Sequence, residues 1–280
     1  MNTQNMWLEA MLDLARQPVG IRFLYNDELY NRCETAEASA PLPYCLAVRN
    51  ASLGTACKLN IKKMACLSGA RALGVLKSEE DIVSLNDISS GHRSYQMGLY
   101  ANYAISHQVA KDMVYCQHQV QGIEIKPFSL YTASQPDVVI IVTNSLNMMR
   151  IVQGYAYHFG QLKDTKVTGN QAICQECTSY PFERDQVNFS FLCSGTRHVA
   201  KWHDDEISIG IPFHYLDKII DGICQTANPM DSNKAKKLIL QKAAKYGLSN
   251  QIDIKLGNNY YTGGYGTLEY HRRKNNQIIK

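Results

Sequence analysis

Nine cysteines are distributed along this chain, and six of them lie in two blocks of similar sequence. The first block, CLAVRNASLGTACKLNIKKMACLSGAR, covers residues 45–71, and the second, CQECTSYPFERDQVNFSFLCSGTR, covers residues 174–197. Each block begins with a cysteine and ends with a cysteine that is followed closely by Ser-Gly-x-Arg. Cysteines among polar residues, used twice in the same pattern, are typical of metal ligands or reactive thiols.

The two blocks suggest an internal repeat with pseudo-two-fold symmetry. In this alignment Cys45 corresponds to Cys174, and Cys66 corresponds to Cys193, with a shift of one residue before the Ser-Gly step. A chance match is the alternative. The repeat predicts that Cys66 and Cys193 lie near each other at helix N-termini around a shared cavity. Cys174 should approach from the same side, with Cys45 as its symmetry mate.

The Ser-Gly-x-Arg segments predict an anionic centre. A Ser-Gly step before a helix directs backbone N–H groups and the positive helix end toward the sulfur, which favours the thiolate. The arginines that follow would stabilise the negative charge of a cluster or of a ligand carboxylate or phosphate. The candidate cofactor contacts are therefore Ser68, Gly69, Arg71, Ser194, Gly195 and Arg197.

Four thiolates from two related halves suit an iron–sulfur cluster, with a zinc ion as the alternative, because both take four ligands. The predicted metal ligands are Cys45, Cys66, Cys174 and Cys193. Cys177 makes a C-x-x-C with the third of these, but no second C-x-x-C stands at zinc-finger spacing. Cys116 and Cys224 lie in apolar stretches, which predicts buried, unreactive thiols.

The same residues also fit two other functions. The segments could line a metal-free pocket of a small-molecule or anion-binding domain. Alternatively, Cys193 could be an enzyme nucleophile with His198 or His203 as its base, because a reactive thiol needs a base within hydrogen-bond reach. Asn144 follows an apolar strand and precedes a helix, where it could contact a ligand or simply cap the helix.

Composition limits the class of protein. Apolar residues make up 45% and charged residues 19% of the chain, as in globular proteins. The net charge of +4 does not favour a nucleic-acid partner. The first twenty residues do not resemble a signal peptide, and no apolar run reaches membrane-spanning length. We therefore expect a cytoplasmic protein without a membrane partner, in a compartment where cysteines stay reduced.

Strand and helix patterns mix throughout, which predicts an α/β fold: a single compact mixed unit, with two pseudo-symmetric halves and a C-terminal helix and tail. Strands are expected at 19–26, 122–132, 137–144, 187–192 and 206–211, and helices at 6–16, 102–114, from 145, 213–225 and 233–247. Residues 84–98 are expected to be a loop. The predicted division is 1–230, with halves 18–120 and 121–230, and then 231–280, which ends in a Gly- and Tyr-rich tail.

The order of these motifs resembles the domain of unknown function 169 family of bacteria and archaea. PVGIRF, ACLSGARALG, QPDVVIIVTNSLNMMRIVQGYAYHFG, AICQECTSYPF and FLCSGTRHVAKWHDDEISIGIPFHYLDKIIDGI carry the resemblance, over residues 18–227. It implies one compact α/β unit and a cysteine set matching Cys66, Cys174 and Cys193, but no activity. With the cysteine pattern, we expect a cluster protein with an electron-transfer or reductive role and a redox partner or small-molecule ligand.

Overall fold

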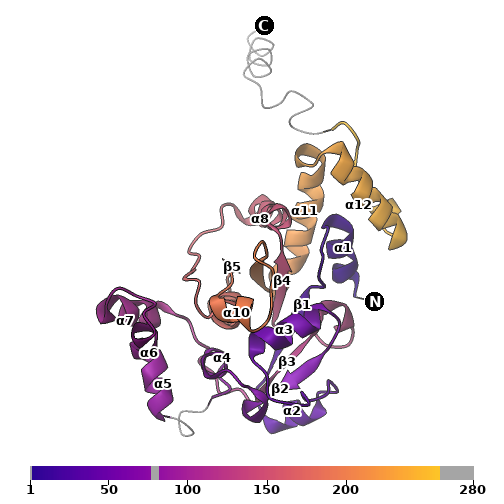
Figure 1. Cartoon of the computed structure of the whole chain (residues 1–280). Coiled ribbons are helices and arrows are strands. Elements are labelled where there is room, and N and C mark those ends of the chain that lie inside the picture. The colour runs from indigo at the N-terminus through magenta and orange to yellow at the C-terminus, as the bar shows by residue number, and fades with distance from the viewer. Residues whose placement is uncertain (1, 77–81, 259–280) are drawn as a thin grey trace. The chain divides into compact units, whose positions relative to one another are not determined.

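The computed structural model describes residues 2–76 and 82–258 (Figure 1), without the side chains of 82–85. Contacts divide the chain into two compact units. Unit 1 comprises residues 15–148 and 163–215 together with the first two residues, and unit 2 comprises 3–14, 149–162 and 216–280. All the predicted metal ligands lie in unit 1. The division expected from the sequence, at residue 230, remains a prediction about folding units.

The mixed α/β class is confirmed. Unit 1 contains a six-stranded sheet whose strands all pair antiparallel. The strands are β1 (Val19–Leu24), β2 (Cys57–Leu59), β3 (Gly122–Pro127), β4 (Val138–Thr143), β5 (Asn188–Ser190) and β6 (Ile207–Pro212). The helices of unit 1 are α2 (Asp27–Arg32), α3 (Tyr44–Ser52), α4 (Leu67–Ala72), α5 (Ile82–Ser89), α6 (His92–Gln96), α7 (Tyr103–Asp112), the π-helix η3 (Ala172–Ser179), α9 (Tyr180–Arg184) and α10 (Ser194–His198). Short 3₁₀ turns are η1 (Ile61–Lys63), η2 (Phe128–Leu130) and η4 (Phe213–Tyr215).

The sheet has a mirrored strand order, β2-β3-β1-β4-β6-β5. In each half of the sheet, the strand that comes last in sequence (β3 or β6) lies between the other two strands of that half. The strands that come first, β1 and β4, pair with each other at the centre of the sheet. The register is the same in both halves. Ile123, the second residue of β3, pairs with Phe23 and Leu59, and Ser208, the second residue of β6, pairs with the equivalent Val142 and Ser190. This symmetry supports an internal repeat, although it groups β3 with the first half, whereas the expected restart at residue 121 groups it with the second.

One set of helices covers the sheet and connects the two halves. Helix α3 packs on β1 and β3, while η3 packs on β4, β5 and β6. Both α3 and α4 also contact η3. Strand β4 is buried at every position because it lies at the centre of the sheet, which explains its continuous run of β-branched residues. The main apolar core therefore extends across both halves.

The expected loop at 84–98 is wrong, because helices α5 and α6 occupy most of it. Helix α6 is polar and α5 lacks a strong helical stripe, so the local sequence pattern gave little signal. Contacts with α7 stabilise the turn between the two helices instead. The buried Ser106 donates a hydrogen bond of 2.6 Å from Oγ to the carbonyl of Gly91, and His107 Nδ1 lies 2.8 Å from the carbonyl of Ser90.

Strand β6 carries a glycine at the point where η3 approaches most closely. A Cβ atom at Gly210 would lie 2.1 Å from the carbonyl oxygen of Cys177. No real side chain fits there, because the obstructing atom belongs to the backbone of η3. The absence of a side chain on β6 thus sets the distance between η3 and the sheet.

A buried carboxylate joins β3 to β1. Glu124 is 2% exposed, and its oxygens lie 3.0 Å from Arg22 Nε and 2.9 Å from Lys126 Nζ. The hydroxyl of Thr35 also donates to it. Burial alone would raise the pKa of Glu124, but the Thr35 hydrogen bond and the charges of Lys126 and Arg22 outweigh burial and hold the pKa below its usual value.

Replacing Glu124 by glutamine is expected to lower the free energy of unfolding by about 2 kcal/mol at neutral pH, because it removes charge-assisted hydrogen bonds. A lowered native pKa stabilises the folded state above the unfolded value of about 4.3, and this contribution disappears as the pH falls through the native pKa. Urea titrations of wild type and variant should therefore converge between pH 7 and roughly pH 3. Glu28→Gln, at an exposed helical pair with Arg32, is the control and should change stability by less than about 0.5 kcal/mol. A difference independent of pH would contradict the expectation.

Unit 2 is helical in its described part. It contains α1 (Thr3–Met11), most of α8 (Ser145–Phe159), α11 (Leu216–Met230), α12 (Asn233–Lys245) and the 3₁₀ turn η5 (Ser249–Gln251). The C-terminal helix expected from residue 233 is confirmed, while the Gly- and Tyr-rich stretch from 259 lies outside the described residues. Of the helices described in either unit, none has the length and apolarity to cross a bilayer.

Candidate functional site

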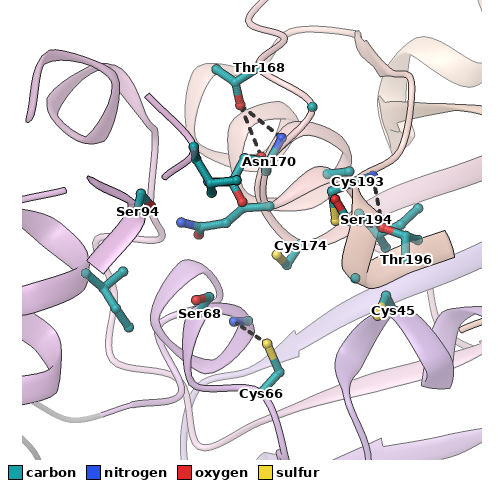
Figure 2. A pocket seen from close by; sticks show the side chains of 18 of the residues that line it. Cys45, Cys66, Ser68, Ser94, Thr168, Asn170, Cys174, Cys193, Ser194 and Thr196 are labelled. Atoms are coloured by element: carbon teal, nitrogen blue, oxygen red, sulfur yellow. Dashed lines mark hydrogen bonds between the residues drawn. The ribbon is translucent and has the colours of Figure 1, made fainter. Parts of the chain in front are cut away.

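A cavity of about 390 Å³ in unit 1 is lined by four cysteines from four separate chain segments. These are Cys45, Cys66, Cys174 and Cys193, the same four residues that the repeated blocks single out. Figure 2 shows their side chains around one space, with Cys174 between Cys66 and Cys193 in this view. Tertiary structure thus brings together cysteines as distant in sequence as Cys45 and Cys193.

Cys66 and Cys193 occupy equivalent positions in the two halves. Each is the N-cap residue of a short helix, α4 or α10, and each follows the outer strand of its half. Cys66 Sγ accepts a hydrogen bond of 3.5 Å from the backbone N–H of Gly69. Cys193 Sγ lies 2.8 Å from the hydroxyl of Thr196, which also accepts from the Cys193 N–H. The predicted placement of both cysteines, at helix N-termini around one cavity, is confirmed.

Cys45 and Cys174 enter the cavity from the helices that precede the outer strands. Cys45 lies in the first turn of α3, and Cys174 lies in the first turn of η3. Because α3 and η3 cover equivalent strands in the two halves and contact each other, they hold these two cysteines on the same side of the sheet. This arrangement matches the expected relation of Cys45 to Cys174 as symmetry mates.

The π-helix η3 was not expected, and it shapes this side of the cavity. Its wide turns leave backbone carbonyls that side chains satisfy: Thr178 Oγ1 donates to Ile173 at 2.6 Å, and Ser179 Oγ donates to Cys174 at 3.3 Å. Thr178 also lies 3.0 Å from the hydroxyl of the buried Tyr44, on α3. Isolated π-turns occur frequently at functional sites. Side-chain hydrogen bonds within the segment AICQECTS, together with one to α3, therefore stabilise it.

The thiols influence one another electrostatically. Burial raises the pKa of Cys174 well above its ordinary value, and the neighbouring Cys66, Cys193 and Cys45 raise it further. Burial also raises the pKa of Cys45 to about 12, with contributions from Cys193 and Cys66. Four thiolates in this space would therefore repel one another strongly. A bound cation or a cationic metal core would remove that repulsion and stabilise the deprotonated forms.

The predicted contacts other than cysteines divide into two groups. Ser68, Gly69, Ser194 and Gly195 line the cavity, as their position beside the N-cap cysteines requires. The remaining three, Arg71, Arg197 and Asn144, are absent from the described lining and make structural contacts instead.

Each of these three polar side chains has partners of its own. The guanidinium of Arg71 stacks on Tyr115 at 4.6 Å from the ring centre. Arg197 donates to the carbonyls of three residues in the connection around α10, namely Phe191, His203 and Glu206. Asn144 Oδ1 accepts from the N–H of Asn147 at 3.0 Å and so caps α8. The roles expected for the three as ligand contacts stay predictions without support from this geometry.

The family assignment agrees with the sequence resemblance. Residues 7–222 match the model of the family DUF169, described as "Uncharacterised ArCR". The chain belongs to the DUF169 family. A protein of Methanocaldococcus jannaschii, titled "Uncharacterized protein MJ0308", is 21% identical over 163 residues, which cover 58% of this chain and 67% of the relative. No solved structure matches this chain.

The sequence did not indicate several of the residues that line the cavity of this DUF169 chain. They come from α3, from α5 and α6 with the turn that follows, and from the segment that leads into η3: Tyr44, Ile88, Arg93, Ser94, Met97, Leu99, Tyr100 and 168–173. Four of them, Ile88, Arg93, Ser94 and Met97, lie in the segment 84–98 that was expected to be a loop. The one available signal was proximity in sequence to Cys174, which applies to residues 168–173 alone.

The remaining cysteines lie outside the cavity wall that the structure describes. Cys177 is fully buried, with Sγ 3.1 Å from Ser208 Oγ on β6, and so faces the sheet. All nine cysteines are free thiols. Neither His198 nor His203 lines the cavity in the described part of the chain, and Cys193 contacts Thr196. The geometry therefore gives no support to a thiol–imidazole pair at Cys193.

Glu176 anchors the segment that leads into η3. It is fully buried, and it accepts hydrogen bonds from the N–H of Thr168 at 2.6 Å and of Gly169 at 3.2 Å. Its second oxygen accepts from the hydroxyl of Ser190 on β5. Because Thr168 and Gly169 line the cavity, this carboxylate positions one wall without touching the open space.

Replacing Glu176 by alanine is expected to release that wall. The change leaves buried N–H and hydroxyl donors without an acceptor, which costs about 3 kcal/mol of unfolding free energy. Amide hydrogen exchange should accelerate at Thr168 and Gly169 more than in β1, because only the former depend on the carboxylate. Glu183→Ala is the control, since that carboxylate accepts from Gln117 outside the cavity wall. Unchanged exchange at both amides would show that other contacts hold the segment.

Proposed function

We propose that this protein binds an iron–sulfur cluster through Cys45, Cys66, Cys174 and Cys193 and acts in electron transfer or reduction. The observation that carries the proposal is the convergence of four cysteines, from two halves with the same strand register, on one cavity. Four thiolates are the usual ligand set of [4Fe–4S] and [2Fe–2S] clusters. When bound, the cluster would supply one-electron transfer.

The groups around the cysteine sulfurs support the proposal of a bound cluster. The N–H of Gly69 reaches Cys66, and the hydroxyl of Thr196 reaches Cys193. Hydrogen bonds to the ligand sulfurs are one of the means by which proteins tune cluster potential. The raised pKa values of Cys45 and Cys174 imply that a metal core must displace protons as it binds. Nine free thiols also suit a reducing compartment, so we place the protein in the cytoplasm.

The described donors, as they stand, do not form a site for a single zinc ion. Within the described residues, no three His, Cys, Asp or Glu side chains are grouped closely enough to hold one metal ion as they stand. Sulfurs around one tetrahedral zinc would lie about 4 Å apart. A cluster accepts more widely spaced cysteines because several irons and sulfides lie between them. Zinc remains the alternative that chemical analysis must address.

Anaerobic purification of the full chain, followed by iron, acid-labile sulfide and zinc analysis, tests the proposal. We expect about four iron and four sulfide per chain for a [4Fe–4S] cluster, or about two of each for a [2Fe–2S] cluster, with visible absorption that bleaches on reduction. About one zinc per chain without sulfide would replace the cluster by a zinc site. Colourless protein without either metal, in which all nine thiols titrate, would overturn thiolate–metal binding altogether.

A further inference from the structure

The wall of the cavity beyond the cysteines contains a buried polar atom without a partner. Gln171 lines the cavity and is 9% exposed. Its Nε2 donates to the hydroxyl of Tyr115 at 3.3 Å and to Met113 Sδ at 3.4 Å. Its Oε1 has no hydrogen-bond partner among the described residues. Because nearly all buried polar atoms in native proteins are paired, an orphan acceptor beside a cavity points to a missing donor on a ligand.

The backbone holds this glutamine in place. Gln171 has φ of +52° and ψ of +44°, a left-handed conformation that a residue other than glycine seldom adopts. Its carbonyl accepts from the N–H groups of Gln175 at 2.8 Å and Glu176 at 3.3 Å, at the beginning of η3. The backbone carbonyl and Nε2 are therefore both engaged. Oε1 is the one polar atom of this side chain left for a ligand.

The same cavity is lined by one positively charged side chain. Arg93, on α6, is the single charged side chain in the lining that the structure describes. It is exposed, and no hydrogen bond or ion pair to another described side chain neutralises its guanidinium. Arginine binds carboxylates in bidentate geometry, and an acidic side chain that could compete is absent from the described lining.

We propose that this part of the cavity binds a small carboxylic acid that also carries a hydroxyl or amino group. Arg93 would bind the carboxylate, and Gln171 Oε1 would accept from the hydroxyl or amino group. The apolar side chains of Ile88, Met97 and Leu99 would contact the carbon skeleton. This proposal rests on the proposed function in one respect, because it makes the acid the substrate or ligand that lies beside the cluster.

Calorimetry on the anaerobically purified full chain tests the proposal with matched probes. The panel comprises 2-hydroxy and 2-amino acids of two to six carbons, the corresponding acids without the hydroxyl or amino group, and the corresponding 2-hydroxy and 2-amino amides. We expect at least one complete acid to bind about ten-fold or more tightly than both its counterparts, because each counterpart leaves one protein group unpaired. Failure of the whole panel to bind would overturn the proposal.

Two substitutions test which residue recognises the carboxylate and which recognises the hydroxyl or amino group. In Gln171→Met the preference for the complete acid over the acid without a donor should fall to about one, while the preference over the amide persists. In Arg93→Gln the preference for the complete acid over the amide should fall to about one, while the preference over the acid without a donor persists. Gln96→Leu and Arg32→Gln, at exposed positions outside the described lining, should bind as wild type does. Preferences that survive both cavity substitutions would contradict the assignment.

Measurements on the same preparations separate this proposal from the cluster. If iron and sulfide are present but no acid binds selectively, the substrate assignment fails and the cluster stands. If metal is absent but the complete acid still binds with the expected preferences, the subsite stands and the cluster fails. Thermal melting verifies folding of each variant. Should Gln171→Met not fold, Gln171→Ala and the independent Arg93→Gln comparison still decide the outcome.

Discussion

Replacing Cys174 by alanine is expected to reduce the iron of the anaerobically purified protein from about four atoms per chain to fewer than about 0.5, for a [4Fe–4S] cluster. The thiol of Cys174 interacts electrostatically with all three other cavity cysteines. Its removal would leave the cluster with three protein ligands and an open coordination position. Iron and sulfide analysis, together with the visible spectrum, measures the loss.

Cys57→Ala provides the matched control. Cys57 is 9% exposed on β2 and lies outside the described cavity wall. Its replacement by alanine also removes one sulfur atom from unit 1, but at a distance from the proposed ligands. It should reduce stability slightly and leave the iron content unchanged. Cys66→Ala and Cys193→Ala should behave like Cys174→Ala if the two halves contribute equivalent ligands. Full iron and sulfide in Cys174→Ala would remove this residue from the ligand set.

Replacing Gly210 by alanine is expected to destabilise the protein by about 3 kcal/mol, because the new Cβ would overlap the carbonyl oxygen of Cys177. Backbone atoms of η3 must move to relieve this overlap. Since η3 also carries Cys174, the same variant should lose much of its metal. Denaturant unfolding and metal analysis give the two measurements.

Gly195→Ala serves as the control for stability. A Cβ there would lie 3.9 Å from Cys193 Sγ, which is ordinary van der Waals contact, and alanine favours the helical conformation of α10. Its free energy of unfolding should be equal to or higher than that of wild type. If Gly210→Ala unfolds at the same denaturant concentration as wild type, the close approach of η3 to β6 does not constrain the fold.

Local sequence was sufficient for the elements with strong patterns. The β-branched run of β4 predicts a buried strand, and the continuous apolar spacing after Ser145 predicts α8, because both patterns follow from the geometry of one segment. The repeated blocks likewise predicted that Cys66 and Cys193 lie at helix N-termini, from the Ser-Gly step that follows each of them. These predictions needed no knowledge of distant contacts.

Elements without a strong local pattern could not be predicted in this way. Helices α5 and α6 depend on contacts with Ser106 and His107 of α7, and η3 depends on Tyr44 and on the sheet surface at Gly210. Propensity is a weak signal where a segment's hydrogen bonds go to distant residues. As a result, nothing in the sequence indicated that Arg93 lines a cavity, and Gln171 had only its proximity to Cys174 as a signal.

The sequence by itself determined which cysteines form the candidate site, because a repeated pattern of residue types is visible without coordinates. Only the tertiary structure decided which charged and polar neighbours accompany them. Arg71 and Arg197 stand beside the cysteines in sequence, yet Tyr115 and backbone carbonyls engage their guanidinium groups. Arg93 is far from every cavity cysteine in sequence, yet it lines the cavity. Long side chains can reach several partners, and the partner that each one meets is set by the packing of distant segments rather than by its neighbours along the chain.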